Sequence, residues 1–388
     1  MINRFGQDEI NSVTQSIKNS SLLSGYTNKF LGGETLQKFE KDFARFHNCK
    51  YGISVNSGTT ALFVSQLAAG VKKNKKVAVP SITFTSTISQ VISSGGMPNF
   101  TDIHHESYCM DFDFKKDVQF AIPVHLLGHP CNYEMIKKMK ECGMFVIEDC
   151  AQAMGAKQKN KMVGSMGDCG IFSFQETKHI TTLGEGGIII TNNEEFAEKC
   201  RRIRNHGEYY KDDSVVGFNF RLTEAQAAFG LVQLKRLPRI LKNFRKNANY
   251  IIERLPEFIT PPIIQENVEH SFLILGCKYN QDKAGISREK FLEKLTKNRK
   301  NFLKTEQISD IKGLNFRPGK IISSGYKTTQ YNVPLYRKFR PKKKLHVAEN
   351  FIKNSFFLDI HRWRTKKEID EELKILEITS QQMNKSDN

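Results

Sequence analysis

The sequence predicts an α/β protein whose largest part is built on a mainly parallel β-sheet. Over the first 200 residues, short β-rich runs alternate with helical stretches, which is typical of parallel strands joined by crossover helices. The β-rich runs are almost continuously apolar, which indicates a sheet covered on both faces. Beyond them lie a long helical region and a more basic mixture of short strands and helices. We therefore expect a large domain over residues 1–245, whose N-terminal residues can pack on the other domain, and a smaller C-terminal α+β domain over 246–388.

Six β-rich runs and two helical stretches between them carry this prediction. The expected strands are 51–57, 76–81, 120–128, 144–150, 169–175 and 187–192, and the expected helices are 59–71 and 132–143. Apolar residues at helical spacing predict a further long helix over 222–255. We expect Pro238 to interrupt that helix, because proline cannot donate a main-chain hydrogen bond.

Composition excludes some classes of protein and leaves others open. Hydrophobic residues make up 39% of the 388 residues, which is enough for a substantial core and excludes disorder for most of the chain. Lysine and arginine exceed aspartate and glutamate by 59 to 41, giving a formal charge of +18. That charge favours phosphate-bearing substrates, nucleic acid or acidic membrane surfaces as partners, and solvated surface lysines explain it equally well.

The sequence also predicts where the protein works. No apolar run approaches the roughly 20 residues that span a bilayer, and the N-terminus lacks the apolar stretch of a signal peptide. We therefore expect a cytoplasmic protein that does not engage a membrane. The eight cysteines contain no CxxC pair, which argues against zinc and redox motifs and favours buried, reduced thiols. No metal site is expected.

The first chemically informative segment is NSGTTALFVSQLAA, residues 56–69. A strand ends there, a Ser-Gly-Thr turn follows, and an apolar helix begins. This arrangement directs main-chain N–H groups and the positive end of the helix dipole toward one point, which makes an anion site. In the alternative interpretation, Ser57 or Thr59 only caps the helix.

Two further segments supply charged groups. VIEDCAQAMGA, residues 146–156, places Glu148 and Asp149 at the carboxyl end of a buried strand, the edge at which open α/β sheets bind ligands. The pattern does not tell which acid faces the ligand. GIFSFQETKHITTLGEGGIIIT, residues 170–191, places Lys178 between two strand-like runs, an unusual position for a merely solvated lysine. A lysine beside an anion site and an acid suits a cofactor that forms a Schiff base.

Together these segments resemble the DegT/DnrJ/EryC1/StrS family of pyridoxal-phosphate (PLP) sugar aminotransferases. The matching stretches follow one another in family order over roughly residues 20–235: FLGGETLQKFEKDFARF, YGISVNSGTTAL, VPSITFTST, PVHLLGHP, VIEDCAQAMGA, FSFQETKHITTLGEGG, RNHG and GFNFRLTEAQAA. The resemblance implies a fold-type-I PLP-dependent transferase, similar to aspartate aminotransferase, with the cofactor at the carboxyl ends of the strands of the large domain.

The resemblance also implies the roles of individual residues. Lys178 is similar to the family lysine that forms the Schiff base and then shuttles a proton, and Asp149 to the acid that keeps the pyridine nitrogen protonated. The remaining matches concern cofactor binding: Gln152 beside the ring and phosphate, Phe84 stacked on the ring, Gly58, Thr59 and Ser173 in the phosphate cradle, and Asn219 reaching the phosphate across a subunit interface. The last role implies a homodimer with shared active sites.

Some of these residues also have simpler structural interpretations, and the sequence departs from the family pattern in two places. Phe84 could be a core aromatic residue and Asn219 a turn residue, and His125 and His179 are interpreted as structural. Gly184 stands six positions after Lys178, a spacing that alters the loop near the substrate. The C-terminal half matches less well, notably in SFFLDIHRWRTKKEID, residues 355–370, which leaves the contacts to the substrate and the amino donor open.

The expected function is therefore amino-group transfer, from L-glutamate to a keto-sugar. The expected acceptor is a nucleotide-linked keto-deoxysugar for a surface polysaccharide or glycan. One alternative is a transaminase acting on a keto-sugar acid or cyclitol without a nucleotide. A second is a non-enzymatic regulator that binds nucleic acid through its basic surface, although the sequence shows no helix-turn-helix or zinc motif. Because Lys178 is present, the dehydratase chemistry of relatives with histidine at that position is disfavoured.

Overall fold

The computed structural model describes residues 5–19, 22–26, 31–114, 117–207, 215–303, 322–323, 326–358, 360 and 365–384. Its centre is an eight-stranded sheet with the strand order β1-β10-β9-β6-β5-β2-β3-β4. The strands of this sheet are β1 (Tyr51–Val55), β2 (Lys76–Pro80), β3 (Met97–Ile103), β4 (Met110–Asp111), β5 (Phe120–Ala121), β6 (Phe145–Asp149), β9 (Cys169–Ser173) and β10 (Gly187–Thr191).

The direction of the strands creates one functional edge. The pairs β3–β2, β2–β5, β5–β6 and β6–β9 are parallel, whereas β10 runs antiparallel to both of its neighbours, β9 and β1. The carboxyl ends of β1, β2, β6 and β9 therefore meet at the same edge of the sheet. The α/β class with a mainly parallel sheet is confirmed, with an antiparallel insertion at β10.

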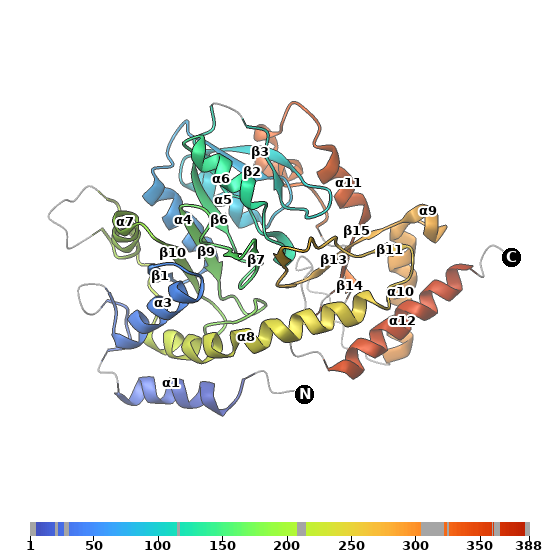
Figure 1. Ribbon diagram of the computed structural model, residues 1–388, viewed down its shortest axis with the longest axis horizontal. Helices are drawn as coiled ribbons and strands as arrows, with labels where there is room; N and C mark the ends of the chain where they lie inside the picture. Colours follow the sequence, from blue (N-terminus) through green and yellow to red (C-terminus); the bar gives the residue numbers. More distant parts are fainter. Residues whose placement is uncertain are drawn as a thin grey trace.

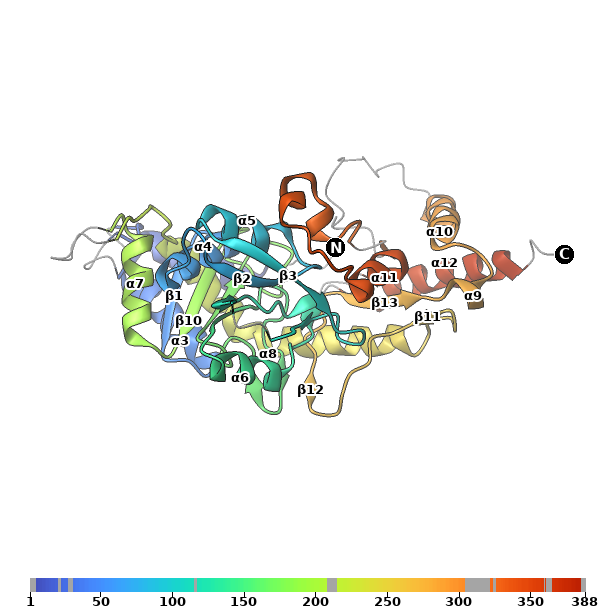
Figure 2. The same cartoon turned by 90° about the horizontal axis from the view of Figure 1, so that it is seen from above.

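Helices cover both faces of this sheet, as Figures 1 and 2 show. They are α3 (Glu34–Phe46), α4 (Gly58–Ala69), α5 (Thr85–Ser93), α6 (Tyr133–Glu141), α7 (Glu194–Arg204) and the first half of α8 (Glu224–Ile252). Val64, Ile147 and Ile171 are completely buried, as are Phe43 and Phe172 on the other side. Burial on both faces explains why the strands are continuously apolar.

The C-terminal part is built on smaller sheets. A four-stranded antiparallel sheet has the order β11 (Ile259–Thr260), β13 (Leu275–Tyr279), β15 (Ser355–Leu358) and β14 (Ile322–Ser323). Its helices are α9 (Gln281–Ala284), α10 (Arg288–Leu303), α11 (His346–Asn354) and α12 (Lys366–Asn384). Two 3₁₀ turns of this part are Gln330–Asn332 and Pro334–Phe339, and a third, Leu126–Gly128, lies in the first half of the chain. A small third sheet joins β12 (Val268–Glu269) to β7 (Lys157–Gln158) and β8 (Lys161–Met162).

Helix α8, yellow in Figure 1, runs from the large sheet to the C-terminal part. The expected interruption at Pro238 is wrong: one helix continues through it. Proline leaves the carbonyl oxygen of Leu234 without its usual donor, but buried leucines on both sides of it, Leu234, Leu237 and Leu241, anchor the helix. The predicted domain boundary at residue 245 falls inside α8, and α1 (Gln7–Asn19) packs along the same helix. The division into domains stays a prediction.

Two strand predictions differ from the structure. The run 120–128 forms a continuous strand only at Phe120–Ala121 and then pairs with β6 through an isolated bridge between Val124 and Asp149. Pro123 has no N–H and Leu127 takes a left-handed conformation with φ 58°, which prevents a longer strand. Strand β3 was not among the expected strands, because MPNFTDI mixes polar and apolar residues. Within the described residues, no helix is both long and apolar enough to cross a bilayer.

Candidate active site

Asp149 lies at the end of β6, at the sheet edge where the strand ends meet. Its carboxylate is buried and accepts hydrogen bonds from the Thr87 hydroxyl at 2.9 Å and from the Ala151 N–H at 3.1 Å. Burial raises the pKa of Asp149 above its ordinary value, and the two hydrogen bonds and the charge of Lys178 act against that rise. The carboxylate is therefore held in one orientation, with few groups to offset its charge.

Lys178 lies in the loop between β9 and β10, at the same edge. Burial lowers the pKa of its ammonium group, and the negative charge of Asp149 opposes this effect. Among the described residues, Lys178 Nζ makes no hydrogen bond or ion pair. A lysine with a lowered pKa and no partner presents a nucleophilic amine next to a buried acid, which is the arrangement that covalent amine chemistry requires.

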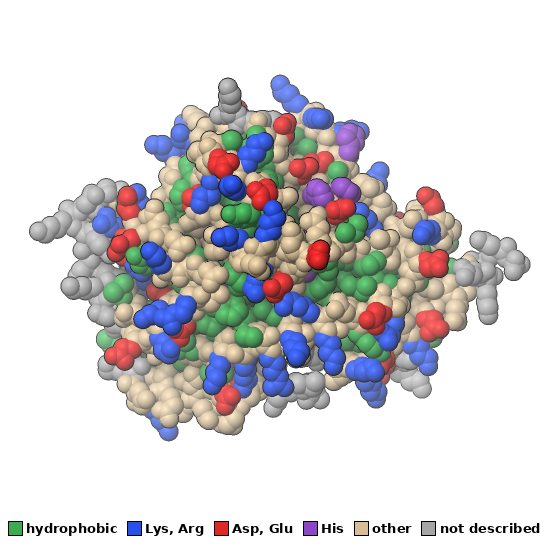
Figure 3. Space-filling view, in the orientation of Figure 1, with side chains coloured by type: hydrophobic (Ala, Val, Ile, Leu, Met, Phe, Trp, Pro, Cys, Tyr) green, Lys and Arg blue, Asp and Glu red, His purple; other side chains and the backbone are tan. Residues whose placement is uncertain are grey.

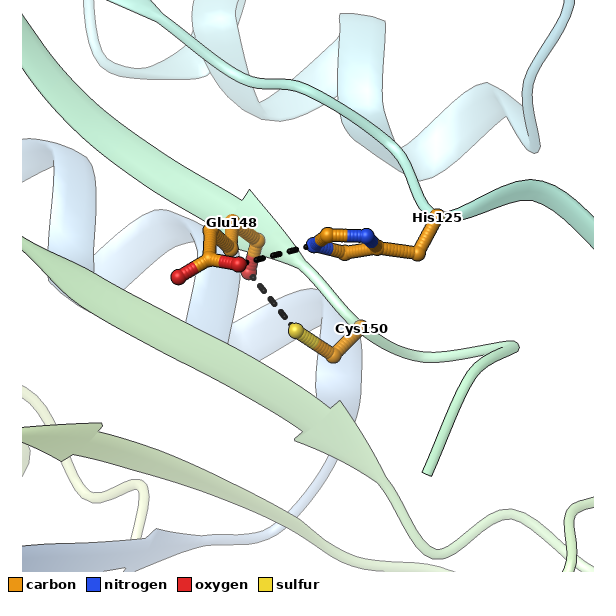
Figure 4. A group of neighbouring side chains, drawn as sticks. All are labelled: His125, Glu148 and Cys150. Carbon is orange, nitrogen blue, oxygen red and sulfur yellow. Dashed lines mark hydrogen bonds and ion pairs between the residues drawn. The ribbon is translucent and has the colours of Figure 1, made fainter. Parts of the chain in front are cut away.

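Glu148, the neighbouring acid, belongs to a separate hydrogen-bonded group with His125 and Cys150 (Figure 4). One carboxylate oxygen accepts from His125 Nε2 at 2.9 Å and from the Gly164 N–H, and the other accepts from the N–H groups of Met166 and Gly167. Cys150 Sγ points to the main-chain oxygen of Glu148 at 3.7 Å. Successive strand residues point to opposite faces, which explains the separation of the two acids.

His125, Glu148 and Cys150 are close enough to resemble a metal site, and their bonding shows why they form a structural cluster instead. His125 Nδ1 accepts from the Cys131 N–H at 2.9 Å, so its other ring nitrogen is the donor to Glu148. Both oxygens of Glu148 are already occupied by donors. The cluster also holds the end of β6, since the main-chain N–H of His125 donates to the main-chain oxygen of Asp149.

The start of α4 has the local geometry that the sequence predicts for an anion site. Ser57 is the cap of this helix and accepts from the Thr60 N–H, whereas Thr59 is exposed in the first turn. The N–H groups of Gly58 and Thr59 have no acceptor in the described part of the chain. A Cβ atom at Gly58 would lie 2.7 Å from Ser173 Cβ, so α4 approaches the end of β9 too closely for any other residue. Gly58 and Thr59 thus present main-chain N–H groups beside Ser173, and the binding of a phosphate in this cradle stays a prediction.

Thr83 and Phe84 lie between β2 and α5 at the same edge, and Thr87 lies in the first turn of α5. The Phe84 side chain is 59% exposed, so it is not the core aromatic residue of the plainer interpretation. The hydroxyls of Thr83 and Thr87 are 2.8 Å apart, and the Thr87 hydroxyl donates a hydrogen bond to Asp149. The sequence analysis did not single out these threonines, although both stand in the quoted motif VPSITFTST.

Gln152 connects the site to the C-terminal part of the chain. Its side-chain oxygen accepts from the Leu127 N–H at 2.9 Å, and its amide nitrogen donates to the Tyr326 hydroxyl at 3.1 Å. Tyr326 follows β14 and contacts Phe357 of β15. No feature of the sequence marked Tyr326, because the resemblance weakens before it.

The remaining predicted residues have simpler surroundings. Asn219 is exposed and pairs through its main chain with Asn205. The adjoining Phe220 carbonyl accepts from the Asn56 N–H, which brings this segment beside the start of α4. His179 is buried and its Nε2 lies 3.1 Å from the Ser271 carbonyl oxygen, in agreement with a structural role. Contact between Asn219 and a second subunit stays a prediction.

The chemistry of these residues fits PLP. The cradle offers N–H donors suited to a phosphate, Phe84 offers an exposed ring face, and Asp149 offers a buried anion for a ring nitrogen. Lys178 offers an amine for an aldehyde. The glycine at position 58 is also required, since a side chain there would fill the space between α4 and β9.

Comparison with known proteins agrees with this site. The model of the DegT/DnrJ/EryC1/StrS aminotransferase family matches residues 6–307. The spore coat polysaccharide biosynthesis protein SpsC of Bacillus subtilis is 32% identical over 313 residues, 75% of this chain and 78% of SpsC. A GDP-perosamine synthase of Escherichia coli O157:H7 is 36% identical over 239 residues, 57% of this chain and 65% of the synthase. An aminotransferase structure from Psychrobacter cryohalolentis is 25% identical, with a TM-score of 0.85 over 98% of each chain.

Proposed function

The chain belongs to the DegT/DnrJ/EryC1/StrS aminotransferase family and is a PLP-dependent sugar aminotransferase, and on this premise we propose its reaction. The amino donor is L-glutamate, and the acceptor is a nucleotide-linked keto-deoxysugar. The products are an amino sugar and 2-oxoglutarate, with the amino sugar used for a surface polysaccharide or glycan. The observation that carries the proposal is the electrostatic influence that Lys178 and Asp149, both desolvated, have on each other, beside the cradle of Gly58 and Ser173.

Each residue has one task in this proposal. PLP supplies an electron sink that stabilises negative charge on the carbon next to the transferred nitrogen. Lys178 Nζ holds the cofactor and, once released, moves a proton at the substrate carbon. Asp149 holds a proton on the ring nitrogen by its charge, and Thr87 keeps that carboxylate oriented. Phe84 covers the ring, and the cradle binds the phosphate.

The nature of the acceptor rests on the relatives and on charge. A GDP-perosamine synthase and a spore coat polysaccharide biosynthesis protein are 36% and 32% identical to this chain. The charge of +18 agrees with a substrate that carries a diphosphate, although solvated surface lysines explain it equally well. The experiment therefore varies both the sugar and the nucleotide.

The test measures 2-oxoglutarate formed from L-glutamate with a panel of keto-sugars, offered free and linked to GDP, UDP or dTDP. We expect turnover only with nucleotide-linked acceptors and none with Lys178→Ala. Turnover of free keto-sugar acids or cyclitol ketones would overturn the nucleotide proposal in favour of the alternative transaminase. Borohydride reduction, followed by peptide mass spectrometry, should place the cofactor on Lys178, and a label on another lysine would refute the assignment of the site.

A further inference from the structure

Tyr326, which lies just after the C-terminal sheet, is the one described residue beyond residue 245 that bonds directly to a predicted cofactor-binding side chain. It follows β14, which pairs with β15, and its ring lies 6.0 Å from that of Phe357 on β15 at an angle of 87°. Phe357 is buried, so the Tyr326 ring rests on a fixed support. The hydroxyl group projects from this support to Gln152.

The bonding of Gln152 fixes the orientation of its amide. The Leu127 N–H is a donor, so the Gln152 oxygen must face Leu127 and the amide nitrogen must face Tyr326. That nitrogen carries two hydrogens. One goes to the Tyr326 hydroxyl, and the other has no acceptor among the residues that the structure describes. Gln152 is itself buried, and its hydrogen bonds to Leu127 and Tyr326 fix the direction in which the second N–H points.

We propose that Tyr326 is a positioning residue, which holds the Gln152 amide so that its second N–H is presented to the cofactor. The inference rests on the proposed function. Through Tyr326, the C-terminal sheet takes part in shaping the cofactor site, although the family motifs lie almost entirely in the first 235 residues.

The surroundings of Tyr326 support this role. Burial raises the pKa of Tyr326 to about 12; the Gln152 hydrogen bond acts against this rise and the charge of Asp149 adds to it. The phenol therefore stays neutral at physiological pH and keeps a lone pair for the Gln152 N–H. The influence of Asp149 also shows that Tyr326 lies within electrostatic reach of the catalytic acid.

The experiment replaces the hydroxyl alone and reads the cofactor rather than turnover. Tyr326→Phe keeps the ring on Phe357 and removes the acceptor for Gln152. We expect the dissociation constant of PLP from the apo-protein to rise about threefold to tenfold, the range for one neutral hydrogen bond. An N–H donor favours the anionic form of the oxygen it meets, so we also expect the visible absorbance of the bound cofactor to titrate at higher pH.

Tyr331→Phe is the matched control. Tyr331 is also buried in the C-terminal part, and its hydroxyl bonds to Glu349 at 3.2 Å rather than to a cofactor-binding candidate. This variant loses a hydroxyl of the same kind, so it should leave the PLP dissociation constant and the absorbance titration unchanged. Equal effects of the two tyrosine variants would assign Tyr326 to general packing and overturn the inference.

A double-mutant cycle separates action through Gln152 from direct contact with a ligand. In a Gln152→Ala background, or Gln152→Met if the alanine variant does not fold, Tyr326→Phe should have no further effect on PLP binding. A full additional loss in that background would show that Tyr326 contacts the ligand itself and would refute the positioning role. If wild-type protein does not bind PLP, the proposed function fails. If it binds PLP and Tyr326→Phe matches it, only this inference fails.

Discussion

At the scale of single residues, two neighbouring acids have opposite tasks. Glu148 receives four donors from His125 and the 164–167 turn, whereas Asp149 receives two and shares its surroundings with Lys178. The sequence predicts two acids at a strand end without distinguishing them. The family resemblance favours Asp149, and the bonding of each carboxylate in the structure supplies a physical reason.

This difference predicts that two amide variants change different properties, turnover in one and stability in the other. Asp149→Asn removes the charge that holds a proton on the ring nitrogen, so turnover should fall by at least about a hundredfold while the fold stays intact. Glu148→Gln places an N–H₂ group against main-chain donors, so the free energy of unfolding should fall by about 1–3 kcal/mol with little change in the spectrum of the bound cofactor. Denaturant unfolding and cofactor spectra measure the two effects. Equal catalytic losses from both variants would remove the distinction.

The lowered pKa of Lys178 predicts its reactivity toward an amine-acylating reagent in the apo-protein. Lowering the pKa of a lysine leaves more of the amine uncharged at neutral pH, so Lys178 should be modified faster than exposed lysines such as Lys235. Asp149 opposes that lowering, so in Asp149→Asn the pH midpoint of the reaction should move to lower pH. Peptide mass spectrometry over a pH series follows both lysines. A midpoint that moved upward would contradict the coupling of the two groups.

At the scale of elements, α4 and α8 show what the sequence can and cannot predict. The Ser-Gly-Thr turn before an apolar stretch predicts the start of α4 correctly, because capping and close approach are local properties. The predicted interruption of α8 at Pro238 is wrong, because burial of the leucines around it outweighs the hydrogen bond that proline cannot donate. Tyr326 escaped prediction for a similar reason, since its partner Gln152 is 174 residues away.

Pro238 therefore predicts a stabilising substitution. It lies on the exposed side of α8, and Pro238→Ala would restore a donor to the Leu234 carbonyl. The gain is partly offset by the greater freedom of the unfolded chain, so we expect the free energy of unfolding to rise by about 1–2 kcal/mol. Asn243→Ala, also exposed on α8, is the control and should change it by only a few tenths of that amount. A destabilising Pro238→Ala would show that the helix depends on the proline.

At the scale of the whole molecule, the surface charge and the catalytic site are separate features. Lys and Arg side chains gather in a row over α8 in Figure 3, where Lys235, Arg239, Lys242 and Lys246 are exposed. Their spacing places them on one face of the helix. These cations contribute to the charge of +18 as solvated surface, so the net charge alone is weak support for a phosphate-bearing substrate.

The small residues of α8 also have a task within their own subunit. A Cβ at Gly230 would meet the Phe39 ring of α3 at 2.8 Å, and the Ala228 carbonyl accepts from Ser12 of α1. Their close packing is thus explained without a second subunit. The case for a shared active site rests on Asn219, which is exposed beside the start of α4 and, by resemblance, reaches the phosphate of a partner.

Mixed dimers test that case. Lys178→Ala and Asn219→Ala are each expected to be inactive as pure proteins. If Asn219 serves the partner's cofactor, a mixed dimer holds one site with both changes and one with neither, because a two-fold axis exchanges the contributions. Activity should then return after subunit exchange, to at most about a quarter of the wild-type rate per subunit, since half of the dimers are mixed and half of their sites are intact. Mass spectrometry of differently tagged subunits confirms the exchange. Exchange without recovery would place Asn219 and Lys178 in the site of one subunit or show that Asn219 is dispensable, and turnover of pure Asn219→Ala decides between these.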